Sequence, residues 1–165
     1  MNGQLYSVSF ASNDATTVVK DIFEITGSTK SNYRVRELTL SKIGAAFSST
    51  AQELLTLLIR RGSSAAAAGG ATATPRNLDG RSDATATFAI ALNSSTPGSS
   101  TGEIIYSGSW NTNQMFVWRP PKNESPICIL SQRLQVRLGA SAANITIAGT
   151  MIVEEIGKMP GSGVQ

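Results

Sequence analysis

Short segments in which apolar and polar residues alternate recur along almost the whole chain, and this period of two constrains the fold more than any other feature. Successive side chains of a β-strand point to opposite faces of a sheet, so the period predicts strands with one buried face. In the first segment, Tyr6, Val8 and Phe10 share one face. The clearest further segments span residues 84–92, 104–110, 134–138 and 145–153.

Other segments predict strands with local irregularities. Residues 18–25 are more apolar, and we expect them to be buried in part on both faces. In residues 33–40, the apolar side chains change phase between Val35 and Leu38, which one β-bulge would produce. Shorter apolar runs at 115–118 and 127–130 predict two further strands.

The leucine-rich segment 51–61 fits two periods. A helical spacing of its leucines competes with a strand spacing through Leu55, Leu57 and Ile59. We favour a strand because the neighbouring segments are strands, with a helix as the alternative.

About eight to ten strands with turn signals between them predict an all-β protein, an antiparallel sandwich, jelly roll or barrel. We expect a single domain over residues 1–157 and a flexible C-terminal tail at 158–165. Residues 62–82 are rich in Ala, Gly and Ser and predict a long loop. We expect that deleting residues 64–74 would weaken assembly and leave the fold intact.

The composition argues against catalysis. The 165 residues contain no histidine, which removes the commonest general base and metal ligand, and one cysteine, Cys128, which we expect to pack as a small hydrophobic residue. The acids lie near predicted strand ends and turns, where they are expected to be solvated. Glu154 and Glu155 are adjacent, but they should point to opposite faces of a strand. We therefore expect no enzyme activity, no catalytic residue, no cofactor and no metal site.

The charged fraction is 15% and the net charge is +3, so the electrostatic signal for an acidic partner is weak and we expect no direct contact with nucleic acid. A weakly charged surface rich in hydroxyl groups suits packing against other protein. The N-terminal residues do not resemble a secretory signal, and no apolar run is long enough to span a membrane, so we expect a chain made in a cytoplasm with no membrane partner.

Basic and aromatic residues provide the candidate contacts. Neighbouring strands could gather the arginines into a patch, or each arginine could be solvated and paired with an acid. Trp118 could stack on a sugar ring or pack at a subunit contact. The candidates for partner contact are Arg34, Arg36, Arg60, Arg61, Arg76, Trp118 and Arg119.

The C-terminal third carries a family resemblance. An aromatic strand, Met115–Pro121, is followed by the apolar run at Ile127 and by Leu134, Val136 and Leu138 in a Leu-x-Val-x-Leu pattern. The last strand ends as Gly149–Gly157.

Together with the first strand and the Thr74-Pro75-Arg76 loop, these features resemble small β-sandwich proteins of tailed-phage and prophage structural genes. Within that class, the chain is most similar to jelly-roll capsid decoration, or cement, proteins. Of the three all-β architectures, this family resemblance implies an antiparallel, jelly-roll-like β-sandwich.

The resemblance implies a virion structural protein that binds the major capsid protein on the outside of a phage head and stabilises it. It also implies self-association, as a homodimer or a homotrimer. The alternatives are a tail, baseplate or head-fibre module, and a lectin-like glycan-binding domain.

Overall fold

The computed structural model describes residues 3–15, 18–43, 54–79, 85–99, 101–141 and 145–157. These residues form strands and turns and no helix, and thus no helix that could cross a membrane. The strands are β1 (Gln4–Ala15), β2 (Lys20–Thr26), β3 (Asn32–Ile43), β4 (Leu54–Arg61), β5 (Ala71–Ala73), β6 (Arg76–Asn77), β7 (Ala89–Ser94), β8 (Glu103–Asn111), β9 (Phe116–Trp118), β10 (Ile127–Cys128), β11 (Arg133–Leu138) and β12 (Ile145–Ile156).

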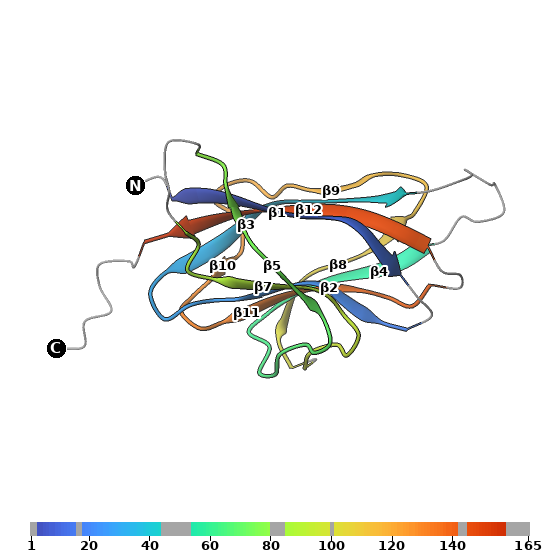
Figure 1. Ribbon diagram of the computed structural model, residues 1–165, viewed down its shortest axis with the longest axis horizontal. Coiled ribbons are helices and arrows are strands. Elements are labelled where there is room, and N and C mark those ends of the chain that lie inside the picture. The colour runs from blue at the N-terminus through green and yellow to red at the C-terminus, as the bar shows by residue number, and fades with distance from the viewer. Residues whose placement is uncertain are drawn as a thin grey trace.

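The strands form two antiparallel sheets that lie face to face (Figure 1). The first sheet has the order β10-β3-β12-β1-β6, and β9 also pairs with β3. The second sheet has the order β5-β7-β2-β11-β4-β8. The prediction of an all-β antiparallel sandwich is confirmed.

The core lies between the two sheets and is made by the inward faces predicted from the period of two. Phe23, Leu57 and Met151 are among its fully buried members. Trp110 is buried here, and so is Cys128, whose prediction as a packed hydrophobic residue is confirmed.

The change of phase in β3 is a β-bulge, as predicted. Glu37 lies opposite Ile152 and Val35 lies opposite Val153, which leaves Arg36 as the extra residue on β3. The bulge restores the inward direction of the apolar side chains, so those on both sides of it are buried.

Several boundaries differ from the sequence predictions. Segment 51–61 is a strand from Leu54 onward, which confirms the favoured alternative, and residues 51–53 lie outside the described residues. The strand predicted at 84–92 begins only at Ala89. Val18 and Val19 are exposed and precede β2. The expected tail at 158–165 lies outside the described residues.

Residues 62–79, the described part of the predicted loop, contain two short strands. β5 pairs with β7 and β6 pairs with β1, so this segment adds a short edge strand to each sheet. Figure 1 shows the chain passing from one sheet to the other between β5 and β6.

Candidate interaction surface

Two acids of β2 are buried on the face of the second sheet that points away from the core. Asp21 has no exposed surface and Glu24 is 3% exposed, so the expectation of solvated acids is wrong for this pair. β2 is buried on both faces, as predicted, but its outer face is polar because two loops cover it.

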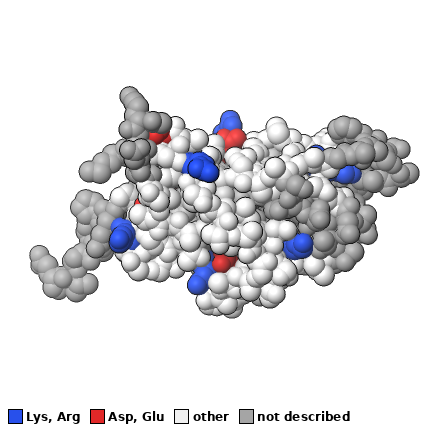
Figure 2. Space-filling view, viewed as in Figure 1, with Lys and Arg blue, Asp and Glu red and all other residues white. Residues whose placement is uncertain are grey.

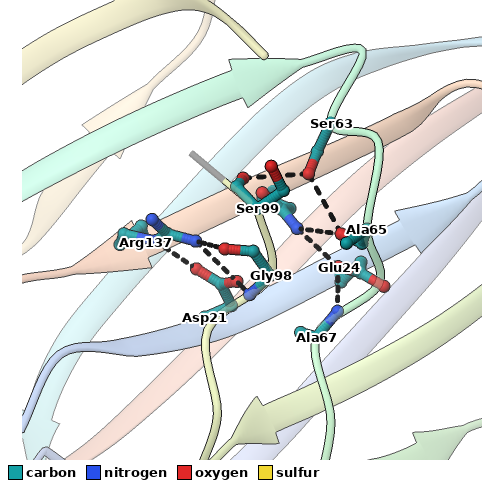
Figure 3. A network of polar contacts seen from close by, with 9 residues as sticks. Asp21, Glu24, Ser63, Ala65, Ala67, Gly98, Ser99 and Arg137 are labelled. Atoms are coloured by element: carbon teal, nitrogen blue, oxygen red, sulfur yellow. Dashed lines mark hydrogen bonds and ion pairs between the residues drawn. The ribbon is translucent and has the colours of Figure 1, made fainter. Parts of the chain in front are cut away.

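Asp21 holds the first of these loops. Its Oδ1 accepts a hydrogen bond from Arg137 Nε at 2.7 Å, and its Oδ2 accepts one from the Gly98 N–H at 2.7 Å (Figure 3). Arg137 Nη2 donates to the Gly98 carbonyl at 2.7 Å. The buried ion pair therefore fixes both backbone groups of Gly98.

Glu24 holds the second loop. Its Oε2 accepts hydrogen bonds from the Ala67 N–H at 2.9 Å and from Gln135 Nε2 at 2.7 Å. Gln135 lies opposite Glu24 on β11 and also reaches the carbonyl of Ala65. A carboxylate that accepts backbone and amide hydrogens in this way fixes the position of the loop.

The two loops are also bonded to each other. Ala68 and Thr96 exchange two backbone hydrogen bonds, each 3.0 Å long, and Ser63 Oγ donates to the Ser99 carbonyl at 2.9 Å. A Cβ atom at Gly98 would lie 2.0 Å from Gln135 Nε2 and 2.7 Å from the backbone carbonyl oxygen of Ala65, so this position requires glycine.

We call the outer surface of these two loops the plateau. Its exposed residues are small and uncharged: Ser64, Ala65, Ala66, Ala68, Gly69, Gly70, Ser95 and Thr96. The plateau is thus a neutral surface of short side chains whose backbone is held from below by two buried carboxylates.

The candidate arginines on β3 are paired with one acid. Glu154 is 5% exposed and lies 3.4 Å from Arg34 Nε and 3.7 Å from Arg36 Nη1. It also accepts a hydrogen bond from the Gly3 N–H, while Glu155 bonds to Thr87. Glu154 and Glu155 thus reach different partners, as expected for adjacent strand residues.

Two other candidate arginines form ion pairs near the β8 and β9 side of the sandwich. Arg119 makes a two-pronged contact with Glu37, at 3.1 Å from Nε and 2.6 Å from Nη2. Arg61 binds Glu103, and its Nη1 donates to the Ile127 carbonyl at 2.9 Å, which ties β4 of the second sheet to β10 of the first.

The remaining candidates complete a scattered distribution. Arg60 lies opposite Gln135 in the second sheet, and Arg76 is exposed on β6 at the far edge of the first sheet. The structure therefore does not bring the predicted arginines into one basic patch. Figure 2 likewise shows a mostly white face on which charged side chains stand apart.

Trp118 is half-buried, and its ring packs inward against an aromatic neighbour. The ring centroids of Trp118 and Tyr106 are 6.1 Å apart, and Phe116 lies 5.9 Å from the same tyrosine. This cluster joins the adjacent edges of the two sheets, and its packing leaves the indole less available as a flat sugar platform.

The environment of the lone cysteine keeps its thiol in the protonated form. Burial raises the pKa of the Cys128 thiol to about 11, against the opposing effects of the Tyr33 hydroxyl and Arg61. Burial also raises the pKa of Tyr33, whose hydroxyl donates to the Gln132 carbonyl at 2.9 Å. The thiol is protonated at neutral pH and has no access to solvent.

A hollow of about 450 Å³ lies at the end of the sandwich where Arg61, Glu103 and Ile127 meet. Its guanidinium and carboxylate neutralise each other, so it offers no unpaired charge to a ligand. Among the described residues, no three acids or cysteines are placed to hold a metal ion.

The sequence contained one signal for the plateau that its interpretation missed. Asp21 and Glu24 flank Ile22 and Phe23, and acids within so apolar a strand have to find partners if both faces are buried. Their partners, Gly98, Ala67 and Arg137, are distant in sequence, so alternation alone could not identify them.

Comparisons with models of known protein families and with curated proteins find no match to this chain.

Proposed function

We propose that the chain is a virion structural protein, a capsid decoration or cement subunit that binds the major capsid protein on the outer surface of a phage head. The family resemblance supplies this class of function. The observation that carries the proposal is the plateau, a neutral surface of small side chains fixed by the buried Asp21 and Glu24.

The plateau suits protein contact for two physical reasons. Small uncharged side chains lose little hydration when they are covered, and they let a partner's backbone approach closely. A backbone already fixed by hydrogen bonds loses little conformational entropy on binding, which lowers the cost of association.

Head stabilisation follows from where such a surface would bind. A subunit that contacts neighbouring capsid proteins has its full site only in the assembled shell, so its binding favours that shell. Repetition of a modest contact across the lattice adds avidity where copies also contact one another.

We include the jelly-roll class in the proposal. In chain order the eight major strands alternate between the sheets except at β4 and β8, which are neighbours in the second sheet, so that β1-β12-β3-β9 belongs to one sheet and β2-β11-β4-β8 to the other. This order is expected of two interleaved Greek keys and supports the assignment. The proposal gives the chain a virion location after synthesis in a host cytoplasm, and it assigns no catalytic residue, cofactor or nucleic-acid partner.

Quantitative mass spectrometry of particles made by the strain that encodes the chain tests the proposal. We expect a copy number similar to that of the major capsid protein. A few copies per particle would overturn the head assignment in favour of a tail, baseplate or fibre, and absence from particles would overturn the virion assignment.

Substitutions on the plateau test the contact surface. We expect Ala66→Arg and Ala66→Glu each to reduce the copies bound to heads, because Ala66 is exposed and either side chain would hold the partner away. Thr29→Arg, an equally exposed change between β2 and β3, is the control. Equal binding by all three variants would move the contact away from the plateau.

A further inference from the structure

The β8 strand leaves one long sheet edge without a partner among the described residues. β8 ends the second sheet and is nine residues long, whereas the other edge strands, β5, β6, β9 and β10, have two or three residues each. Proteins usually shorten, charge or cover their edge strands to prevent association. Residues 106–111 of β8 carry no charge and no proline, and no described strand pairs with this edge.

The hydrogen bonds of β4 identify which groups of β8 are unpaired. The Thr56 carbonyl accepts from the Gly139 N–H at 2.7 Å, and the Gly62 N–H donates to the Arg133 carbonyl at 2.8 Å. Backbone groups of successive strand residues point to opposite sides, so the even-numbered residues of β4 bond to β11 and the odd-numbered ones bond to β8.

The register then assigns the groups of β8. Tyr106, Gly108 and Trp110 lie opposite odd-numbered residues of β4 and direct their N–H and C=O groups toward that strand. Ser107 and Ser109 therefore direct theirs away from the sheet. Both serines are exposed, and no described strand lies on that side.

We infer that β8 is a dimerisation strand, which pairs antiparallel with β8 of a second copy about a two-fold axis at Gly108. In this register, Ser107 of each copy lies opposite Ser109 of the other, and the two residue pairs exchange four backbone hydrogen bonds. Gly108 lies opposite itself in a pair without hydrogen bonds, where the two backbones come closest, about 4.5 Å between Cα atoms. A residue without a side chain suits that crossing.

Charge and symmetry favour a second copy over a different protein. An antiparallel two-fold pairing brings only neutral side chains of residues 106–111 together, and the acid of β8, Glu103, lies outside this stretch and is bound to Arg61. The pairing also leaves no unpaired β8 edge in either copy, so the assembly closes as a dimer and does not extend into a fibre. The second sheets of the two copies would join into one continuous sheet.

Sedimentation or light scattering of the purified chain from low to high micromolar concentration tests this inference. We expect a dimer for the wild type and for Ser109→Ala, which keeps the backbone N–H. Ser109→Pro removes an N–H that points away from β4, so it should give a folded monomer. Ser109→Lys places a charge on the edge, and it provides a second monomeric variant if the proline disturbs folding.

Circular dichroism and thermal unfolding confirm that each variant is folded. A wild type that is monomeric at every concentration, a trimer, or a dimer that neither substitution dissociates would overturn the inference. The test needs no phage particle, so its result is independent of the proposed place in a virion.

Discussion

At the scale of single residues, burial decides what each charge contributes. Asp21 and Glu37 are both bound by an arginine through two bonds, but the first pair lies beneath a loop and the second is exposed to water. Water screens the exposed pair, and the side chains there lose entropy by holding one geometry. The buried carboxylate of Asp21 has no contact with solvent, so water cannot replace its arginine.

We therefore predict that Arg137→Met lowers the free energy of unfolding by about 3–5 kcal/mol, because it leaves Asp21 buried without its cation. Arg119→Met is the matched control and should change the stability little. Urea denaturation of both variants measures the difference. Equal small losses would mean that Asp21 does not depend on Arg137.

Cys128 gives a pH-dependent prediction. The pKa of its thiol is about 11 in the folded chain and about 9 when unperturbed, so between these values the unfolded chain loses a proton that the folded chain keeps. Stability should consequently fall as the pH rises from 9 to 11, by about 2 kcal/mol from this residue.

Cys128→Ala isolates that contribution, since Tyr33 and the other tyrosines remain in both proteins. The variant should lose less stability than the wild type between pH 9 and pH 11, measured by denaturation at each pH. Parallel pH profiles for the two proteins would contradict the prediction.

The residue pattern of the sequence predicted which way side chains point, but it could not predict hydrogen-bond or ion-pair partners that are distant in the sequence. The alternation in β1, the phase change in β3 and the burial of Trp110 follow from local spacing. The pairing of Glu24 with Ala67, or of Arg34 with Glu154, depends on which strands become neighbours, and a single sequence contains no period that reports this.

At the scale of elements, the segment after β4 does more than connect two strands. Residues 64–74 supply the Ala67 N–H to Glu24 and also include β5, which pairs with β7. The sequence predicted that deletion of residues 64–74 would weaken assembly and leave the fold intact. The contacts of Ala67 and β5 give this segment a part in the fold as well, because its short side chains let the backbone lie close to the sheet.

We predict that deletion of residues 64–74 lowers the free energy of unfolding by at least about 2 kcal/mol. The deletion removes the Ala67 N–H that donates to Glu24, and it exposes the side chains of Glu24 and Gln135 to solvent. The double substitution Ala65→Ser and Ala66→Ser keeps the backbone and should be nearly neutral. Chemical denaturation compares the two proteins. A deletion as stable as the wild type would show that the loop only rests on the sheet.

At the scale of the whole molecule, the two-sheet architecture could be predicted because it needs only strand number, strand length and turn signals. The positions of the strands within the sheets could not, since they depend on pairs far apart in the chain: β12 lies between β1 and β3, and β11 lies between β2 and β4. For the same reason, the sequence could not identify β8 as an edge strand.

Because β12 lies between β1 and β3, β1 remains without its main partner for part of the synthesis of the chain. β1 ends at Ala15 and its principal partner begins at Ile145, so about 130 residues must be translated before the two can meet. At roughly 5–20 residues per second, the first strand remains without this partner for on the order of ten seconds. Ser7 and Ser9, which alternate with its apolar side chains, keep that waiting strand half polar while the ribosome completes the rest of the sheet.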